Sequence, residues 1–150
     1  MANPSLLHAV VFQVGDLVCA LPAGIVLEVL SSLTPTRIPG TDESVAGLVN
    51  VRGALLTVVD AHALLGRAAL ADDEGAIIVV DRGARRVGLL VGRVLDFLEV
   101  PAHALASTDM LPGVDARIVQ AVGSWADRHF VVLDTDKLLA STFGADGTTG

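Results

Sequence analysis

The sequence has few aromatic residues, a single cysteine and no excess of positive charge. Aromatic side chains account for 3% of its 150 residues, so valine, leucine, isoleucine and alanine must build the core almost alone. The one cysteine, Cys19, lies in the apolar stretch VCAL, where an unpaired thiol usually acts as a small buried hydrophobic residue. The net charge of -7 at pH 7 leaves no basic stripe to neutralise phosphates, so no nucleic-acid partner is expected.

Long hydrophobic runs and catalytic signatures are missing as well. No apolar stretch approaches the roughly 20 residues that a spanning helix needs, and residues 1–7 carry no basic segment followed by a long apolar run. We therefore expect a cytoplasmic protein without direct membrane insertion. The four histidines are scattered, and HExxH, paired-cysteine and glycine-rich phosphate-loop motifs are absent, so no metal or cofactor is indicated.

What the chain does have is a series of short aliphatic runs separated by glycine and aspartate. The runs are HAVVFQV, GALLTVVD, AIIVVD, VGLLVGRVL and HFVVLD. Short β-branched and aliphatic runs bounded by turn-forming residues are typical of strands. Helix is expected only in short segments that begin after Asp60 and Asp134, whose carboxylates can act as N-caps. We predict a mainly β fold with short capping helices and a flexible tail at 144–150.

The two halves of the sequence resemble each other. Residues 21–30 match residues 89–98 at an offset of 68, with aligned glycine and acidic positions. LLTVVDAHALLG at 55–66 resembles HFVVLDTDKLLA at 129–140 at an offset of 74. This ordered series favours duplication over chance similarity between aliphatic stretches. We expect one domain over residues 1–150, built of two similar five-stranded β-barrel lobes at about 8–70 and 74–142.

Arg52 is the residue least expected in its surroundings. It stands in GLVNVRGALLTVVD, residues 47–60, where almost every neighbour is aliphatic or glycine. At an offset of 74 the corresponding turn of the second half has Ser124, Ala126 and Asp127 in place of Asn50, Arg52 and Gly53. The repeated fold therefore does not require an arginine in this turn.

The ordered motifs resemble those of the CheW family of chemotaxis coupling proteins. The stretches are VFQVGDLVCALPAGIVLEVL, TRIPG, GLVNVRGALLTVVDAHALLG, VGLLVGRVLDFLEV and HFVVLDTDKLL, and the resemblance covers roughly residues 8–140. The most specific motif of the family, G-V-x-N-L-R-G before an apolar strand ending in Asp, is present here from Gly47 to Asp60.

The resemblance implies two intertwined SH3-like β-barrels and a non-catalytic adaptor. Such proteins join a CheA-type histidine kinase to the cytoplasmic hairpin tips of methyl-accepting chemoreceptors. The kinase's regulatory domain is a relative of the same fold, so ring assembly beneath the receptor array at the inner membrane is a further implication. The receptor, the kinase and the output pathway are not specified by the motifs.

The resemblance and the residue chemistry together predict a partner-binding surface. In a turn, Asn and Gly accept unusual backbone angles and would hold Arg52 outward. A guanidinium surrounded by aliphatic residues suits an interface that buries an apolar helix and satisfies an acceptor. Two alternatives remain open: an internal ion pair between Arg52 and Glu28, and a core position for Val26. The predicted partner-binding residues are Val26, Glu28, Val49, Asn50, Val51, Arg52 and Gly53.

Two other classes of function remain as alternatives. An aliphatic double barrel can carry a small apolar ligand between its lobes. A hydrolase is the weaker alternative, because Asp60 and His62 with Ser31 or Ser32 resemble parts of an acyl-transfer triad but no G-x-S-x-G elbow supports the nucleophile.

Overall fold

The structure is a computed structural model of the whole chain. It describes residues 6–31, 33–83, 85–101, 105, 116–125 and 127–143. The predicted flexible tail at 144–150 lies outside these residues.

Each half of the sequence forms five strands followed by one helix. The first half contains β1 (Leu6–Val14), β2 (Leu17–Pro22), β3 (Val26–Ser31), β4 (Val45–Val51), β5 (Ala54–Asp60) and α1 (Ala61–Leu65). The second contains β6 (Ala76–Asp81), β7 (Arg86–Val91), β8 (Arg93–Pro101), β9 (Val119–Trp125), β10 (Arg128–Leu133) and α2 (Thr135–Phe143). The 3-10 turns among the described residues are η1 (Ala23–Ile25) and η3 (Ala116–Ile118). The offset of 74 places β4 on β9 with identical bounds, so the repeat seen in the sequence is also a structural repeat.

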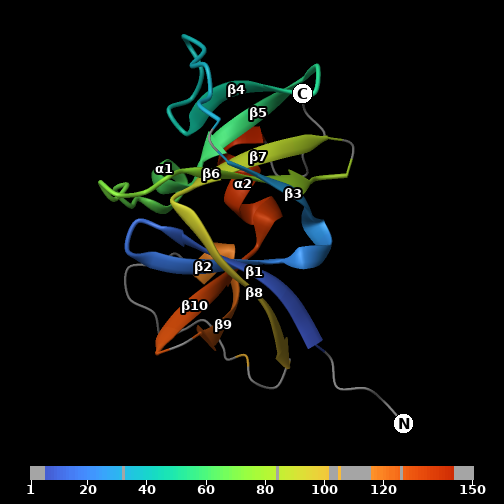
Figure 1. Cartoon of the computed structure of the whole chain (residues 1–150), viewed down its shortest axis with the longest axis vertical. Helices are drawn as coiled ribbons and strands as arrows, with labels where there is room; N and C mark the ends of the chain where they lie inside the picture. Colours follow the sequence, from blue (N-terminus) through green and yellow to red (C-terminus); the bar gives the residue numbers. More distant parts are fainter. Residues whose placement is uncertain are drawn as a thin grey trace.

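The two halves exchange strands. Sheet A has the order β8-β1-β2-β10-β9, and sheet B has the order β3-β6-β7-β5-β4. In both sheets the first and second strands of one half lie between the third and fifth strands of the other (Figure 1). The mainly β, intertwined fold with two five-stranded units is therefore confirmed. The ranges 8–70 and 74–142, predicted as lobes, correspond to the two sequence repeats. Neither repeat forms a sheet by itself, because each sheet contains strands of both. The closure of each sheet into a barrel stays a prediction.

Inner strands such as β6 are buried on both faces, because the buried apolar residues in the described part of the chain form three clusters. In β6, Ile78 and Val80 belong to the central cluster, which contains residues of both sheets. Ile77 and Val79 belong to a second cluster, whose buried members all come from sheet B. A third cluster, around Phe130, lies against the other face of sheet A. Continuous apolar runs such as AIIVV follow from burial on both faces. Cys19 is fully buried in the central core, as predicted.

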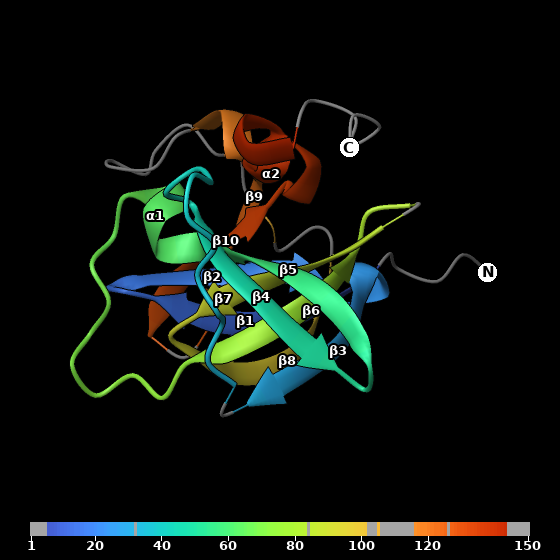
Figure 2. The same ribbon diagram turned by 90° about the horizontal axis from the view of Figure 1, so that it is seen from above.

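Both helices begin at the predicted aspartates. The Asp60 carboxylate accepts from the backbone N–H of His62 at 2.9 Å, and Asp134 accepts from that of Lys137 at 3.2 Å. Helix α2 packs into the central core through Leu138 and Leu139. Figure 2 shows both helices on one side of the stacked sheets. No helix in the described part of the chain is long and apolar enough to cross a membrane.

Candidate functional site

The turn that carries Arg52 is a two-residue β-hairpin loop. Val51 pairs with Ala54 across it, and Arg52 and Gly53 have φ angles of 51° and 88°. Positive φ at both central residues is typical of a type I′ turn. The prediction that asparagine adopts the unusual angles was wrong: Asn50 belongs to β4, and its side chain accepts a 2.9 Å hydrogen bond from the N–H of Gly53. Arg52 itself adopts the left-handed conformation.

Arg52 is paired and also exposed. Its guanidinium donates to the Glu28 carboxylate of β3, so the internal ion pair that the sequence left open is present. The Arg52 side chain is nevertheless 70% exposed, whereas that of Glu28 is 28% exposed. The pair holds the guanidinium in a defined direction while leaving most of it accessible.

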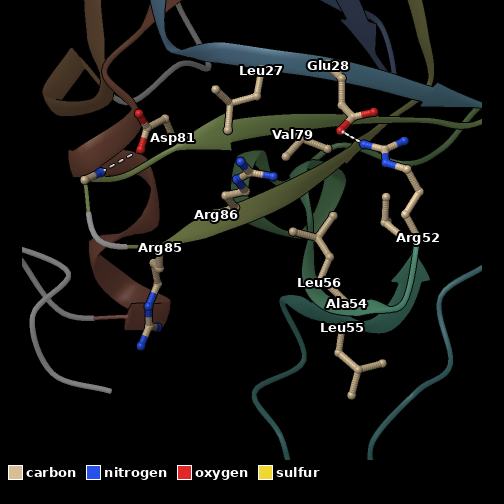
Figure 3. A pocket seen from close by; sticks show the side chains of 12 residues that line it. Leu27, Glu28, Arg52, Ala54, Leu55, Leu56, Val79, Asp81, Arg85 and Arg86 are labelled. Carbon is tan, nitrogen blue, oxygen red and sulfur yellow. Dashed lines mark hydrogen bonds and ion pairs between the residues drawn. The ribbon is translucent and has the colours of Figure 1, made fainter.

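A groove with a volume of about 770 Å³ opens beside this ion pair. We call it the arginine groove (Figure 3). It lies between β3, the β4–β5 hairpin and the β6–β7 hairpin, and it is lined by Leu27, Glu28, Val51, Arg52, Ala54, Leu55, Leu56, Val79, Asp81, Gly83, Arg85 and Arg86. Three of the predicted residues, Glu28, Val51 and Arg52, therefore share one cavity.

A second depression brings the two sheets together. We call it the β3–β8 depression, and it is lined by Val10, Ala23, Val26, Leu27, Glu28, Val29 and Phe97, with a volume of about 340 Å³. Phe97 of β8 pairs with Val10 of β1 and is 67% exposed. The sequence analysis did not identify Phe97. At the offset of 68, Phe97 aligns with Val29, which lies in the segment of the first repeat that was predicted to line the groove.

The predicted residues that line a cavity are divided between two depressions that share Leu27 and Glu28. Val26 is half-buried and lines the β3–β8 depression, whereas Val51 and Arg52 line the arginine groove. Asn50 and Gly53 are exposed at the turn. Val49 differs from the expectation: it is 5% exposed and packs in the interior of sheet B, because alternation along β4 turns it inward opposite Leu56.

The first glycine of the family motif has a steric role. Gly47 has a φ of 143°, and a Cβ atom at this position would collide with the carbonyl group of Thr36. Thr36 and Leu48 exchange backbone hydrogen bonds of 2.8 and 2.9 Å. Glycine is therefore required where the segment before β4 crosses its edge.

Only part of the hypothetical triad is assembled. His62 Nδ1 lies 2.9 Å from Asp60 Oδ1, and its Nε2 is 3.9 Å from Asp73 Oδ2 without a hydrogen-bond partner. Ser31 ends β3 at an exposed position, and Ser32 lies outside the described residues. The Asp60–His62 contact belongs to the start of α1.

Fold and site define a strand-exchanged, two-sheet β protein with an apolar and a charged depression beside one edge strand. The chain belongs to the CheW-like domain family, whose model matches residues 8–143. It is 31% identical over 134 residues to "Chemotaxis protein CheW" of Rhizobium meliloti, covering 88% of this chain and 86% of that protein. It is 26% identical over 108 residues to the protein of the same name from Klebsiella aerogenes, covering 71% of this chain and 65% of that protein.

The fold is also that of a solved CheW structure. The scaffolding protein TtCheW from Thermoanaerobacter tengcongensis superposes with a TM-score of 0.83 at 22% identity, covering 98% of this chain and 94% of that chain. At this level of identity the match establishes the shared fold.

Proposed function

We propose that this chain is a non-catalytic adaptor that couples a methyl-accepting chemoreceptor to a CheA-type histidine kinase. The observation that carries the proposal is the β3–β8 depression, with exposed Phe97 at its edge, in a chain of the CheW-like family. Exposed aromatic residues beside an apolar depression are typical of protein-binding surfaces. The relatives named as chemotaxis proteins support the same role.

The receptor tip is proposed to dock in the β3–β8 depression. Val10 and Val26 offer an apolar base, and Phe97 and Leu27, 67% and 43% exposed, offer side chains that a receptor helix would bury. Helix-in-groove recognition uses apolar anchors at helical spacing. Arg52, held by Glu28 at the neighbouring turn, would supply hydrogen bonds to carbonyl or carboxylate groups of the same partner.

The kinase is proposed to bind elsewhere, because an adaptor must hold both partners at once. Association with the regulatory domain of the kinase, itself a relative of this fold, would permit rings of alternating subunits. The location that goes with this proposed role is the cytoplasm, peripheral to the receptor arrays at the inner membrane.

The proposal is tested by separating the two contacts. Phe97→Ser and Val26→Glu should each weaken binding to the cytoplasmic receptor fragment by about tenfold or more, because they remove an apolar anchor or place a charge beside it. Binding to the kinase should persist. Leu70→Ser is the matched control, since Leu70 is 40% exposed and lines neither cavity. Unchanged receptor binding in both variants, with folding intact, would refute this site.

A further inference from the structure

The segment between α1 and β6, residues 67–75, lies against both sheets. We call it the strap. It leaves α1, which follows β5 of sheet B, and Figure 1 shows it beside the turn of the β1–β2 hairpin of sheet A. The Arg67 guanidinium donates to the Asp16 carboxylate of that turn at 3.2 Å. Arg93, the first residue of β8 in sheet A, donates to the backbone carbonyl of Asp72 at 3.2 Å. The strap therefore joins the end of α1 to two points of sheet A.

Two glycines allow the strap to approach these points closely. A Cβ atom at Gly15, in the β1–β2 turn, would lie 2.7 Å from the carbonyl oxygen of Ala68. A Cβ atom at Gly92, between β7 and β8, would lie 2.6 Å from the carboxylate of Asp73. Both distances are too short for a carbon atom, so a larger residue at either position would displace the strap. The strap is therefore closely packed against both turns.

The Asp73 carboxylate is buried under the strap between two nitrogen atoms that it does not bond. Its side chain is 7% exposed, and Oδ2 accepts from the N–H of Leu70 at 3.1 Å. His62 Nε2 lies 3.9 Å from Oδ2, and Arg93 Nε lies 3.8 Å from Oδ1. His62 Nε2, Asp73 Oδ1 and Arg93 Nε have no hydrogen-bond partner among the described residues. Buried polar atoms without a partner are costly, so a change that supplies one would stabilise the strap.

The protonation state of His62 decides whether this gap can close. Its Nδ1 lies 2.9 Å from the Asp60 carboxylate, which can only accept, so Nδ1 carries the hydrogen of the neutral ring. Nε2 then presents a lone pair to the Asp73 carboxylate, and two acceptors do not bond. A proton on Nε2 makes it a donor, and the same contact becomes a charge-assisted hydrogen bond.

The charges around His62 favour a cation in this buried position. Asp60, at the end of β5, and Asp73, in the strap, both face the ring. Arg93 is the cation nearest to this pair of carboxylates, and it is also 3.7 Å from the carboxylate of Asp72. Burial opposes the imidazolium charge, and the two carboxylates offset that cost.

The other elements packed against α1 bring no further charge to the ring in the described part of the chain. Strands β1 and β7 contact α1. The ionisable residue of β1 is His8, which pairs with Glu99 near the other end of that strand. That of β7 is Arg86, the first residue of the strand, which lines the arginine groove. Arg67, which follows α1, is bonded to Asp16.

We propose that the strap is a proton-controlled clasp, closed when protonated His62 donates from Nε2 to Asp73. Closure holds the strap more tightly against both sheets. Protonated His62 gains a partner that an open strap lacks, so protons favour the closed form. Closure therefore strengthens as the pH falls through the range in which histidine titrates, about pH 8 to 5. The strap lines neither the arginine groove nor the β3–β8 depression, so the clasp does not depend on the proposed receptor contact.

The test is amide hydrogen exchange of the full-length protein, followed by NMR at about pH 8 and about pH 6. Each rate is compared with the intrinsic rate of an unprotected amide at the same pH. The N–H groups of Leu70 and Asp73, which bond within the strap, should be protected about fivefold more at the lower pH, because a charge-assisted hydrogen bond is gained. The His62 ring signals should change from the neutral form to the imidazolium over the same interval.

Three variants assign the response. His62→Gln and Asp73→Asn should each remove most of it, because one loses the proton and the other loses the charge that receives it. His8→Gln is the matched control, since His8 is also close to a carboxylate but its side chain is 61% exposed and distant from the strap. It should leave the response unchanged.

The clasp is refuted if strap protection stays constant or falls on acidification, because His62 is then neutral in the folded protein. A response that persists in His62→Gln would assign it to another group. An equal gain at the N–H groups of β9, at the far edge of sheet A, would indicate a general change in stability and no clasp. If His62→Gln does not fold, the wild-type protein decides: different midpoints for strap protection and for the His62 ring signals would overturn the proposal.

Discussion

The guanidinium of Arg52 lies 2.5 Å from the carboxylate of Glu28 and ties the turn after β4 to a strand 24 residues earlier in the chain. The second repeat has no arginine at the corresponding turn. The ion pair is therefore an addition to the repeated fold, and it orients a side chain that stays largely exposed. Bracing and partner contact are compatible roles for the same residue.

Arg52→Ala and Arg52→Gly should separate stability from coupling. Alanine removes the ion pair and keeps the left-handed backbone, so we expect a loss of about 0.5 to 1 kcal/mol in unfolding free energy. Glycine also relieves the cost of a positive φ, about 1 to 2 kcal/mol, which offsets the lost pair and the added chain entropy. The glycine variant should be at least as stable as the alanine variant in urea unfolding.

Kinase activation in a reconstituted receptor, adaptor and kinase mixture should fall in both variants, because the guanidinium is gone. Glu28→Gln is the control that removes the ion pair and keeps the guanidinium. It should retain most of the coupling. If Glu28→Gln and Arg52→Ala reduce activation equally, Arg52 acts as a brace for its own turn and does not contact a partner.

Gly47→Ala should destabilise the protein strongly. The new methyl group collides with the Thr36 carbonyl, and φ is 143°, so strain and overpacking together should cost about 2 to 5 kcal/mol. Gly53→Ala is the matched control: it also has a positive φ, but its Cβ atom would enter open space. Thermal unfolding should show a much smaller shift for Gly53→Ala, and equal shifts would contradict the steric role of Gly47.

Cys19 should be unreactive until the protein opens. Burial raises the pKa of the Cys19 thiol well above its ordinary value, so the reactive thiolate is scarce at mildly alkaline pH. Reaction with a disulfide reagent should be slow in the native state and should accelerate in parallel with unfolding as urea is added. Because the chain has one cysteine, the rate reports opening of the core between the sheets. Rapid native-state labelling would be inconsistent with this packing.

The strand exchange predicts that neither repeat folds alone. In sheet B, β6 and β7 lie between β3 and β5, so a fragment ending in the segment between α1 and β6 lacks the middle of its own sheet. Separate fragments 1–71 and 72–150 should give disordered far-ultraviolet circular dichroism spectra, and mixing them should restore the β signal. A fragment that unfolds cooperatively by itself would show that a repeat is autonomous.

Much of the local structure was predictable because its causes are local. Aliphatic runs between turn residues indicated the strands, and Asp60 and Asp134 indicated the helix starts. The backbone of the Arg52 turn was not correctly assigned, because asparagine adopts positive φ more readily than arginine, whereas here Arg52 has the positive φ and Asn50 accepts from the N–H of Gly53. Phe97 was missed because an isolated phenylalanine in a strand is usually buried, whereas this one is 67% exposed in the folded chain.

The sequence by itself determined the two repeats, their five strands and one helix each, and the exceptional status of Arg52, because periodicity, capping and turn chemistry act over a few residues. Only the tertiary structure decided which strands pair. Runs such as AIIVV are apolar on both faces and do not favour one sheet over the other, so the exchange of β1–β2 and β6–β7 follows from long-range packing. That same packing buries Val49, exposes Phe97 and places Leu27, Arg52 and Arg86 along one groove.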